Sequence, residues 1–377
     1  MLNARTRFWR FARHEDVDYI PDWGDWVGPA ERWQAEGCPI PTRIPDDHML
    51  RWFSDYFGFE GIFSAFWGEH RVPVNTGVYP GYPHVVYEDT DTYTVYRTGN
   101  GSVVKQFKNE GGLLHSTQWL DYPIKTRADW DEFRSSQLNP DDPGRYPPEA
   151  EWQALKRKWQ VRDHLLSIDG GSFYGIMRDW MGVEGISYTL FEDPQLIHDM
   201  VAYLADFYIK VLHRALHEVD IDFAMFWEDM AYKAGPLVSP AMFRKFFLPG
   251  YQQVTEVLRE HGVTLSWVDC DGNIDALIPL WLEGGVRGFY PLEVASDMDI
   301  NALQRIYGRE ILTWGNVDKR ALIAGPEAID IELERLRPAV EYGGFIPLVD
   351  HGVPDDVPYA HYLYYLEQRR RLCGQPT

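Results

Sequence analysis

The chain has 377 residues, 45% of them hydrophobic, and a formal net charge of −21 at pH 7. This length and apolar content suffice for one large core, and the negative charge excludes a general affinity for nucleic acid or anionic membranes, which select basic surfaces. No apolar run is long enough to span a membrane, and the first residues lack the apolar stretch of a signal peptide. We therefore expect a cytoplasmic protein that acts on a small molecule, with no membrane or nucleic-acid partner; the sequence leaves open whether it forms an oligomer.

The composition of the first part of the chain indicates segments that cover the core of the protein rather than form it. Residues 1–60 combine aromatic and charged side chains with repeated Pro and Gly, which predicts loops and short helices. Residues 84–108 alternate polar and apolar side chains, and Gly99-Asn100-Gly101 supplies a turn, so we predict an antiparallel β-meander. Buried parallel strands are continuously apolar instead. We expect the meander to be an insertion beside the mouth of the fold.

From about residue 165 onward, short apolar segments alternate with amphipathic helical segments. This order predicts parallel strands connected by helices. Six such strands in this part of the chain, with room for two before it, favour a TIM (β/α)8 barrel. The barrel would be a single domain over residues 1–377, with an N-terminal extension and the inserted meander. A doubly wound open sheet is the alternative, but no G-x-G-x-x-G follows a strand.

The predicted strands share polar side chains at their carboxyl ends. A single carboxylate at such a place is most often a cap or turn residue, but the strand ends of a barrel converge on one rim, where the active site lies. Several acids crowded there raise one another's pKa or require a cation. These strand-end residues are Asp169, Glu228 with Asp229, Asp269 with Asp271, Glu293, Asn316 with Asp318, and Asp350 with His351.

Four residues at or after these strand ends are further candidates for a functional role. Glu228 either forms an ion pair with Lys233 or serves as a metal ligand or proton carrier. His351 follows a strand-end Asp350 that could orient its ring, which favours a functional role. Ser172 follows two glycines after a strand, where backbone N–H groups could receive an anion, and Arg178 is either an anion partner or part of a surface ion pair.

Four segments, residues 228–251, 268–293, 313–322 and 343–370, together resemble the uroporphyrinogen decarboxylase superfamily, which also contains cobamide-dependent methyltransferases. The resemblance implies a TIM barrel. In the decarboxylases an Arg-rich N-terminal motif with a glycine holds the substrate carboxylates. Here "RFWRFARHE" lacks that glycine, so Arg10 and Arg13 cannot be assigned that role, whereas "DHGVPDD" is similar to the late histidine segment and carries that histidine onto His351.

The resemblance to the methyltransferases implies a metal site with altered ligands. Their zinc is held by H-x-C-G and a distant cysteine. In this sequence "DCDG" puts Asp269 and Asp271 at the first two ligand positions, and His351 stands at the third. Carboxylates and a histidine form a harder ligand set than thiolates and favour oxygen ligands, with zinc still a candidate. A thiol acceptor is therefore not expected.

From this resemblance we expect a methyltransferase that moves a methyl group between a small O- or N-methylated substrate and a corrinoid (cobalamin) supplied by a partner protein. The expected catalytic residues are Asp271, His351 and Glu228; the metal ligands are Asp269, Asp271, His351 and Glu228; the substrate-binding residues are Asp169, Ser172, Arg178, Asn316 and Glu293. Two alternatives stay open. One is a decarboxylase acting on a carboxylated substrate, with His351 as proton donor, and the other is a non-catalytic tetrapyrrole or corrinoid binder.

Overall fold

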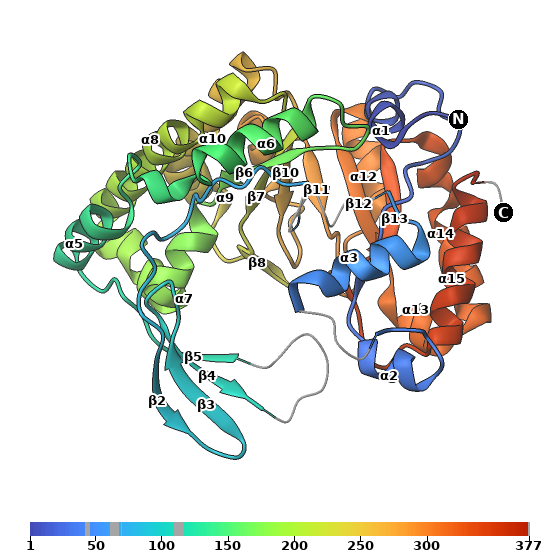
Figure 1. The fold of residues 1–377 in the computed structure, drawn as a ribbon, viewed down its shortest axis with the longest axis horizontal. Coiled ribbons are helices and arrows are strands. Elements are labelled where there is room, and N and C mark those ends of the chain that lie inside the picture. The colour runs from blue at the N-terminus through green and yellow to red at the C-terminus, as the bar shows by residue number, and fades with distance from the viewer. Residues whose placement is uncertain (42–45, 61–67, 69, 109–116, 376–377) are drawn as a thin grey trace.

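The computed structural model describes residues 1–41, 46–60, 68, 70–108 and 117–375. Its centre is a six-stranded parallel sheet in the order β13-β12-β11-β10-β7-β6. Helices cover the outer side of this sheet (Figure 1). The strands are β6 (Ser167–Gly171), β7 (Phe223–Trp227), β10 (Ser266–Asp269), β11 (Gly288–Tyr290), β12 (Leu312–Val317) and β13 (Phe345–Val349).

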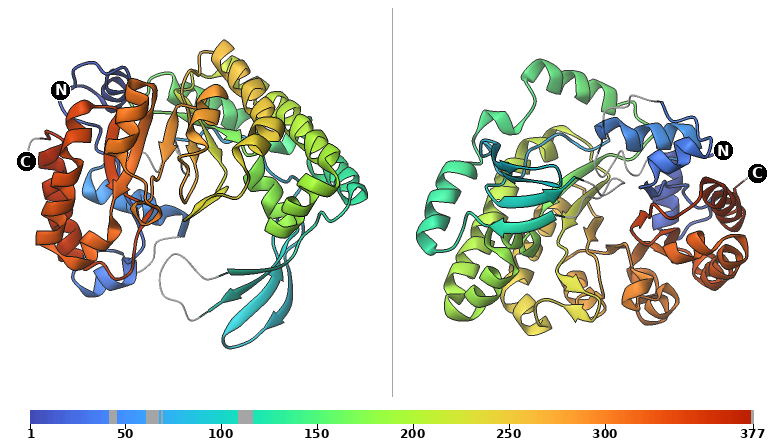
Figure 2. Two further views of the ribbon diagram at one scale, coloured as in Figure 1. Left: turned by 180° about the vertical axis from the view of Figure 1, so that it is seen from behind. Right: turned by 90° about the horizontal axis from the view of Figure 1, so that it is seen from below.

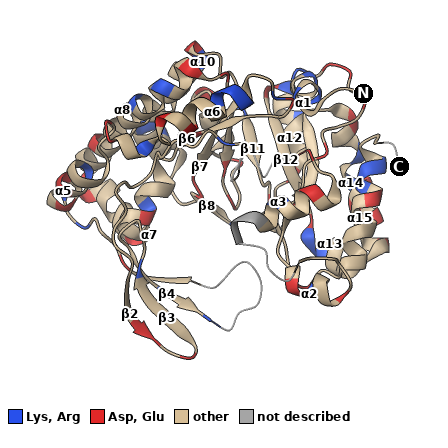
Figure 3. Ribbon diagram, viewed as in Figure 1, with Lys and Arg blue, Asp and Glu red and all other residues tan. Residues whose placement is uncertain are grey.

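The strand order runs in one direction along the sequence, without the reversal that defines a doubly wound sheet. The described residues thus form an α/β fold in which each strand follows its neighbour through a helical connection. The main connecting helices are α7 (Tyr174–Glu192), α8 (Pro194–Glu218), α10 (Leu248–Glu260), α11 (Ile278–Glu283), α12 (Ile300–Tyr307), α13 (Lys319–Ala324) and α14 (Pro326–Tyr342). Charged residues lie mostly on the outer helices and few lie on the strands (Figure 3).

Both faces of the parallel sheet are buried, which explains why its strands read as continuous apolar runs. Every residue of β12 and β13 is buried. On the helix side, Phe226, Val268 and Phe289 belong to the larger apolar cluster. On the other side, Trp267 and Trp314 pack in a second cluster with side chains from the N-terminal residues. The sheet is therefore enclosed on both faces.

Helix α1 (Ala4–Ala12) covers the amino ends of the strands. Asn3 caps it by accepting a hydrogen bond from the Thr6 amide at 2.8 Å. Its Phe8 ring packs 6.3 Å from the ring of Phe223, the first residue of β7. Arg5 donates to Asp222, just before β7, at 2.7 Å. The first helix thus lies at the end of the sheet opposite the strand-end acids.

The following N-terminal residues are tied to the last helix, α15 (Tyr359–Leu372), through buried charges. The Arg369 guanidinium contacts Asp22 at 2.6 Å and Asp25 at 3.2 Å. Asp25 also accepts a hydrogen bond from the Val349 amide at the end of β13, at 2.8 Å. Nearby lie β1 (Trp26–Val27), α2 (Ala30–Ala35) and α3 (Asp46–Phe57), and β1 pairs in parallel with β14 (Gly352–Val353).

An antiparallel sheet of four strands projects away from the parallel sheet (Figures 1 and 2). Val85 and Val95 lie in this sheet, and its fourth strand, β5, extends beyond the predicted range 84–108. We call this four-stranded sheet the arm. The Ser102 hydroxyl donates a hydrogen bond to the Asp179 carbonyl at 2.8 Å and so holds the arm against α7. The strands are β2 (Val85–Asp89), β3 (Tyr93–Arg97), β4 (Val103–Phe107) and β5 (Thr117–Asp121).

The remaining elements connect these parts. Helices α5 (Arg127–Gln137) and α6 (Glu149–Trp159) lie between the arm and β6, and a short hairpin of β8 (Ala231–Tyr232) and β9 (Gly235–Pro236) follows β7. Helix α9 (Pro240–Met242) and a π-helical turn over Phe243–Phe247 lead into α10. Among the described residues, none of the helices combines the length and the hydropathy needed to cross a lipid bilayer.

Candidate functional site

Three aspartates from two neighbouring strands meet at the carboxyl edge of the parallel sheet. Asp269 is the last residue of β10, Asp271 lies two residues further on, and Asp229 lies two residues after β7. Each offers a carboxylate oxygen, and these oxygens all lie within 4.8 Å of one another. The convergence follows from the parallel pairing of β7 with β10, which sets Asp269 opposite Trp227.

These carboxylates are short of hydrogen-bond partners. Oδ1 of Asp271 is buried and has no partner among the described residues. Asp229 accepts one bond from the Asp271 amide, at 3.3 Å. Burial raises the pKa of all three. Repulsion from Asp229 raises the pKa of Asp269 and of Asp271 further, and the pKa of Asp271 rises to about 8. A divalent cation would relieve this crowding, because carboxylate oxygens are its preferred ligands.

His351 lies beside this cluster. Its Nε2 is 3.6 Å from Oδ2 of Asp271, and its ring lies 5.4 Å from the ring of Trp26 in β1. The backbone at His351 has φ 120°, a conformation that L-residues rarely adopt. Burial and the nearby Lys319 lower the pKa of His351, which favours a neutral ring able to act as a ligand. Of the predicted site residues, the structure thus groups Asp269 with Asp271 and places His351 next to Asp271.

Two cations border the aspartates. An Nη1 hydrogen of Arg178 is donated to the carbonyl of Asp229, and Nη2 lies 3.8 Å from the carboxylate of the same residue. The Arg178 guanidinium also stacks over the Trp227 ring at 5.1 Å. On another side, Nζ of Lys319 lies 3.7 Å from Glu293 and 4.0 Å from Asp350. Sequence reasoning missed Lys319, whose position at the start of α13 after β12 is the signal that could have found it.

Glu293 and Asp350 hold the loops around the cluster. Glu293 accepts a hydrogen bond from the Gly272 amide at 2.9 Å, next to Asp271. Asp350 accepts from the Val294 amide at 2.8 Å, and burial raises the pKa of Asp350 to about 7. Of the two, Glu293 was predicted to bind substrate. In the structure it contacts the backbone of the cluster loop and a neighbouring lysine.

Glu228 does not join the cluster, and its neighbour Asp229 stands there instead. The Glu228 side chain is fully buried and accepts hydrogen bonds from the amides of Phe173 and Gly175, both at 2.8 Å, and from the hydroxyl of Tyr251. It therefore satisfies the amino end of α7. These contacts leave it neither in the metal group nor in the ion pair with Lys233 that we considered.

Asn316 is also held by the protein itself. It is fully buried with φ 55°, its side-chain N–H groups donate to the carbonyls of Leu292 and Met298 at 2.8 and 2.9 Å, and its oxygen accepts from Ile300 and Arg335. All its hydrogen-bonding capacity is used. The predicted role in substrate binding does not fit these contacts.

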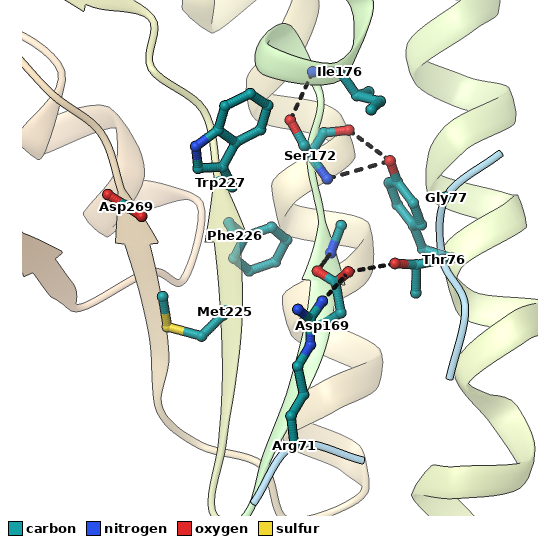
Figure 4. Close-up of a pocket in the computed structure, with 12 residues that line it drawn as sticks. Arg71, Thr76, Gly77, Asp169, Ser172, Ile176, Met225, Phe226, Trp227 and Asp269 are labelled. Atoms are coloured by element: carbon teal, nitrogen blue, oxygen red, sulfur yellow. Dashed lines mark hydrogen bonds and ion pairs between the residues drawn. The ribbon is translucent and has the colours of Figure 1, made fainter. Parts of the chain in front are cut away.

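An apolar cavity of about 190 Å³ lies next to the cluster and is bounded by Asp269 on one side. Met225, Phe226 and Trp227 of β7 form part of its wall (Figure 4). The cavity is large enough for a small molecule, and its wall offers apolar and aromatic contacts, with the carboxylate of Asp269 on one side and that of Asp169 on the other.

Two predicted substrate-binding residues, Asp169 and Ser172, lie on the other side of this cavity (Figure 4). Asp169 forms an ion pair with Arg71 and accepts a hydrogen bond from the Thr76 hydroxyl. The Ser172 hydroxyl accepts from the Ile176 amide at 2.9 Å and contacts Glu228 at 3.3 Å. Both line the cavity but already have protein partners.

The architecture as a whole is similar to that of a solved methyltransferase from Methanosarcina mazei. The two structures align with a TM-score of 0.62 over 98% of this chain and 99% of the other, at 15% sequence identity. At this identity the likeness concerns the fold. It establishes an α/β class of protein built on a parallel sheet.

The sequence identifies the family. Residues 174–372, more than half of the chain, match the family model of uroporphyrinogen decarboxylase (URO-D), and the chain belongs to this family of enzymes. The superfamily assignment made from the sequence is thus confirmed.

Curated relatives match only part of their length. A uroporphyrinogen decarboxylase of Pseudomonas aeruginosa (strain LESB58) is 26% identical over 197 residues, covering 49% of this chain and 51% of the relative. One of Xanthomonas campestris pv. campestris (strain B100) is 27% identical over 195 residues, covering 47% of this chain and 50% of the relative. The chain spans about half the length of the curated relatives that it matches.

Proposed function

We propose that the protein is a metal-dependent methyltransferase that takes a methyl group from the oxygen or nitrogen of a small substrate. The observation that carries this proposal is the group of Asp229, Asp269 and Asp271, with a buried Asp271 oxygen that has no partner among the described residues. His351 supplies a neighbouring nitrogen ligand. The corrinoid acceptor on a partner protein follows from the family resemblance.

The donor set fits a divalent cation that prefers oxygen ligands. Carboxylates suit Mg²⁺, Mn²⁺ and Ca²⁺, and a carboxylate–imidazole set also suits Zn²⁺. When bound, such a cation supplies Lewis-acid polarisation of the substrate atom that carries the methyl group. Asp229, Asp269 and Asp271 would hold it, and His351 would complete the set. This differs from the thiolate ligands of the zinc methyltransferases in the superfamily.

The surrounding residues have separate roles in this proposal. Arg178 contacts the backbone and carboxylate of Asp229 and so fixes that ligand. The apolar cavity receives the body of the substrate against Phe226 and Trp227, and Asp269 stands at its edge toward the cluster. A methylated oxygen or nitrogen would therefore face the acids while the rest of the substrate is shielded from water.

The proposal includes closure of the sheet into a single (β/α)8 barrel over residues 1–377. Two contacts at the ends of the six-stranded sheet support it. Arg71 forms a parallel bridge with Ser167 beside β6, and β1 pairs in parallel with β14 just after β13. One further chain segment thus lies at each edge, which gives the eight positions that a barrel needs.

The test is metal analysis combined with methyl transfer. Protein purified without chelator is analysed for bound metal and then incubated with methyl ethers and methylamines in the presence of reduced free cobalamin. We expect the wild type to hold at least one more metal ion per chain than Asp271→Asn, and we expect methylcobalamin formation in the wild type and its loss in Asp271→Asn. Asp275→Asn is the matched control, because Asp275 is exposed on the same loop and lies outside the cluster. Equal metal in wild type and Asp271→Asn would overturn the proposal.

The second candidate is a decarboxylase, favoured by the Asp271–His351 pair at 3.6 Å and by the raised pKa of Asp271. Without metal, a proton held there could be delivered to the product. Against a uroporphyrinogen-like substrate stands the position of α1: its arginines lie at the amino ends of the strands, where Arg5 pairs with Asp222, remote from the acids. Release of CO₂ from carboxylated pyrroles by metal-free protein would favour this candidate. Binding of tetrapyrroles without either reaction would favour the non-catalytic alternative.

A further inference from the structure

Two histidines from neighbouring helices face each other on the outside of the sheet. His217 lies in the last turn of α8, and His261 is the residue that ends α10. Their Nε2 atoms are 3.4 Å apart, and their ring centroids are 4.5 Å apart. His217 is exposed and His261 is partly exposed, so solvent reaches this pair.

The other nitrogen of each ring fixes its tautomer. Nδ1 of His217 lies 2.7 Å from the carbonyl of His213, and Nδ1 of His261 lies 2.8 Å from the carbonyl of Val257. A carbonyl oxygen only accepts, so each Nδ1 carries the hydrogen. In the neutral rings, both Nε2 atoms are then acceptors whose lone pairs face each other. They have no hydrogen bond to share unless one takes up a proton, whereas a cation satisfies both lone pairs at once.

The spacing of these two nitrogens matches a tetrahedral metal site. Zn–N bonds of 2.0–2.1 Å in a tetrahedral complex set the two nitrogens about 3.3–3.4 Å apart. The structure has 3.4 Å between the two Nε2 atoms. Backbone carbonyls that receive the Nδ1–H groups are also the usual means of orienting histidine ligands. We propose that His217 and His261 form a surface site for Zn²⁺ or a similar imidazole-preferring transition metal, bridging α8 and α10.

Two protein ligands leave the remaining positions to water or to a group from another molecule. Within the described part of the chain, no third His, Cys, Asp or Glu side chain joins this pair. The one group of three or more such side chains there is that of Asp229, Asp269 and Asp271. The net charge of −21 favours any cation near the surface. An open coordination position on a cross-helix site is suited to bind an external ligand.

This site is separate from the aspartate cluster. His217 precedes β7 and His261 precedes β10, so both lie at the amino edge of the sheet, whereas the aspartates follow the carboxyl ends of the same strands. The ligand chemistry also differs, since imidazole nitrogens suit Zn²⁺, Cu²⁺ and Ni²⁺ and carboxylates suit harder ions. The proposal therefore stands independently of the proposed function.

The test is Zn²⁺ binding to metal-stripped full-length protein, measured by equilibrium dialysis and by thermal unfolding. We expect the wild type to bind one more Zn²⁺ per chain than His217→Ala or His261→Ala, and apparent affinity at this site to fall at least tenfold in either variant. Zn²⁺ should raise the midpoint of thermal unfolding more in the wild type than in His261→Ala, because a ligand that bridges two helices binds only the folded protein.

His213→Ala is the matched control. His213 is an exposed histidine one turn before His217 on α8, with ring centroids 4.1 Å apart. It should bind Zn²⁺ as the wild type does. Equal Zn²⁺ binding by wild type, His217→Ala and His261→Ala would overturn the proposal. It would also be overturned if His213→Ala lost as much Zn²⁺ as His217→Ala while His261→Ala lost none. Asp271→Asn should keep the histidine-dependent Zn²⁺. The histidine site can therefore be tested even if the aspartate group binds no metal.

Discussion

Glu228 and Asp229 are adjacent in the chain, and their surroundings are opposite. Burial raises the pKa of both carboxyls. Glu228 accepts hydrogen bonds from two backbone amides and the Tyr251 hydroxyl, whereas Asp229 faces two further acids. A raised pKa alone therefore does not distinguish a structural carboxylate from a binding one. What distinguishes the two is the number of hydrogen-bond donors within the protein that each carboxylate contacts.

The largest effect that we expect from this comparison is on stability. Glu228→Ala should destabilise the protein by about 3–5 kcal/mol, because it leaves the Tyr251 hydroxyl and the amides of Phe173 and Gly175 buried without an acceptor. Urea unfolding measures this change. Glu228→Gln keeps an acceptor oxygen and should lose less. A fully stable Glu228→Ala that has lost bound metal would reverse the roles of the two carboxylates.

A similar structural role is expected for Asn316. Asn316→Ala should cost about 3 kcal/mol, since it removes a side chain that bonds Leu292, Met298 and Ile300 in the buried core. The KM for substrate should stay unchanged in protein that remains folded. Chemical unfolding and steady-state kinetics on the same preparation check both parts. A raised KM with unchanged stability would return Asn316 to the substrate site.

For the aspartates we expect the opposite pattern. Asp271→Asn should weaken binding of a divalent cation by about 100-fold while leaving the metal-free protein as stable as the wild type or more so, because it removes one of three crowded acidic groups. Calorimetric titration with Mn²⁺ or Zn²⁺ and unfolding in EDTA measure the two quantities. A strong loss of stability in EDTA would mean that Asp271 has protein partners after all.

The smallest effect concerns a carboxylate with cationic partners at the surface. Glu218 contacts Lys156 and the Trp152 N–H, both at 2.8 Å. These two contacts, together with a third to Arg214, lower the pKa of Glu218 from 4.5 to about 2. Its stabilising effect is present above pH 4.5 and is lost as the pH falls toward 2. The effect is at most about 1 kcal/mol after solvent screening. Glu218→Gln should therefore flatten the stability curve in this window, and a curve parallel to that of the wild type would contradict the assignment.

The parallel strands could be predicted from the sequence, and so could the proximity of Asp271 to Asp269 and to His351. Strand–helix alternation determines the direction of each strand, and parallel strands bring their carboxyl ends to one edge. The choice between Glu228 and Asp229 could not be made in this way. Asp229 has φ 42°, so the chain leaves the alternating geometry of the strand at that residue, and the pattern no longer tells which side chain faces the rim.

Other misses have similar causes. Asn316 looked like a rim residue because it is polar and near the end of β12, but φ 55° turns it into the core. Lys319 extends from the first turn of α13 to Glu293 and Asp350 beside the cluster, and these contacts depend on how that helix docks. The fourth strand of the arm, β5, lies beyond the predicted range 84–108 and pairs with β4. Alternation of polar and apolar residues within one segment does not reveal such a pairing.

The pairing of Arg369 with Asp22 and Asp25 has a consequence for biosynthesis. Arg369 emerges from the ribosome 344 residues after Asp25, yet its guanidinium is the buried cation that balances both acids. Until the last helix is made, the early segment carries two carboxylates that cannot be buried without a large cost. We therefore expect the segment around Asp22 and Asp25 to dock only after α15 has been made, and a ribosome stalled before that helix would hold a nascent chain with these two acids still exposed.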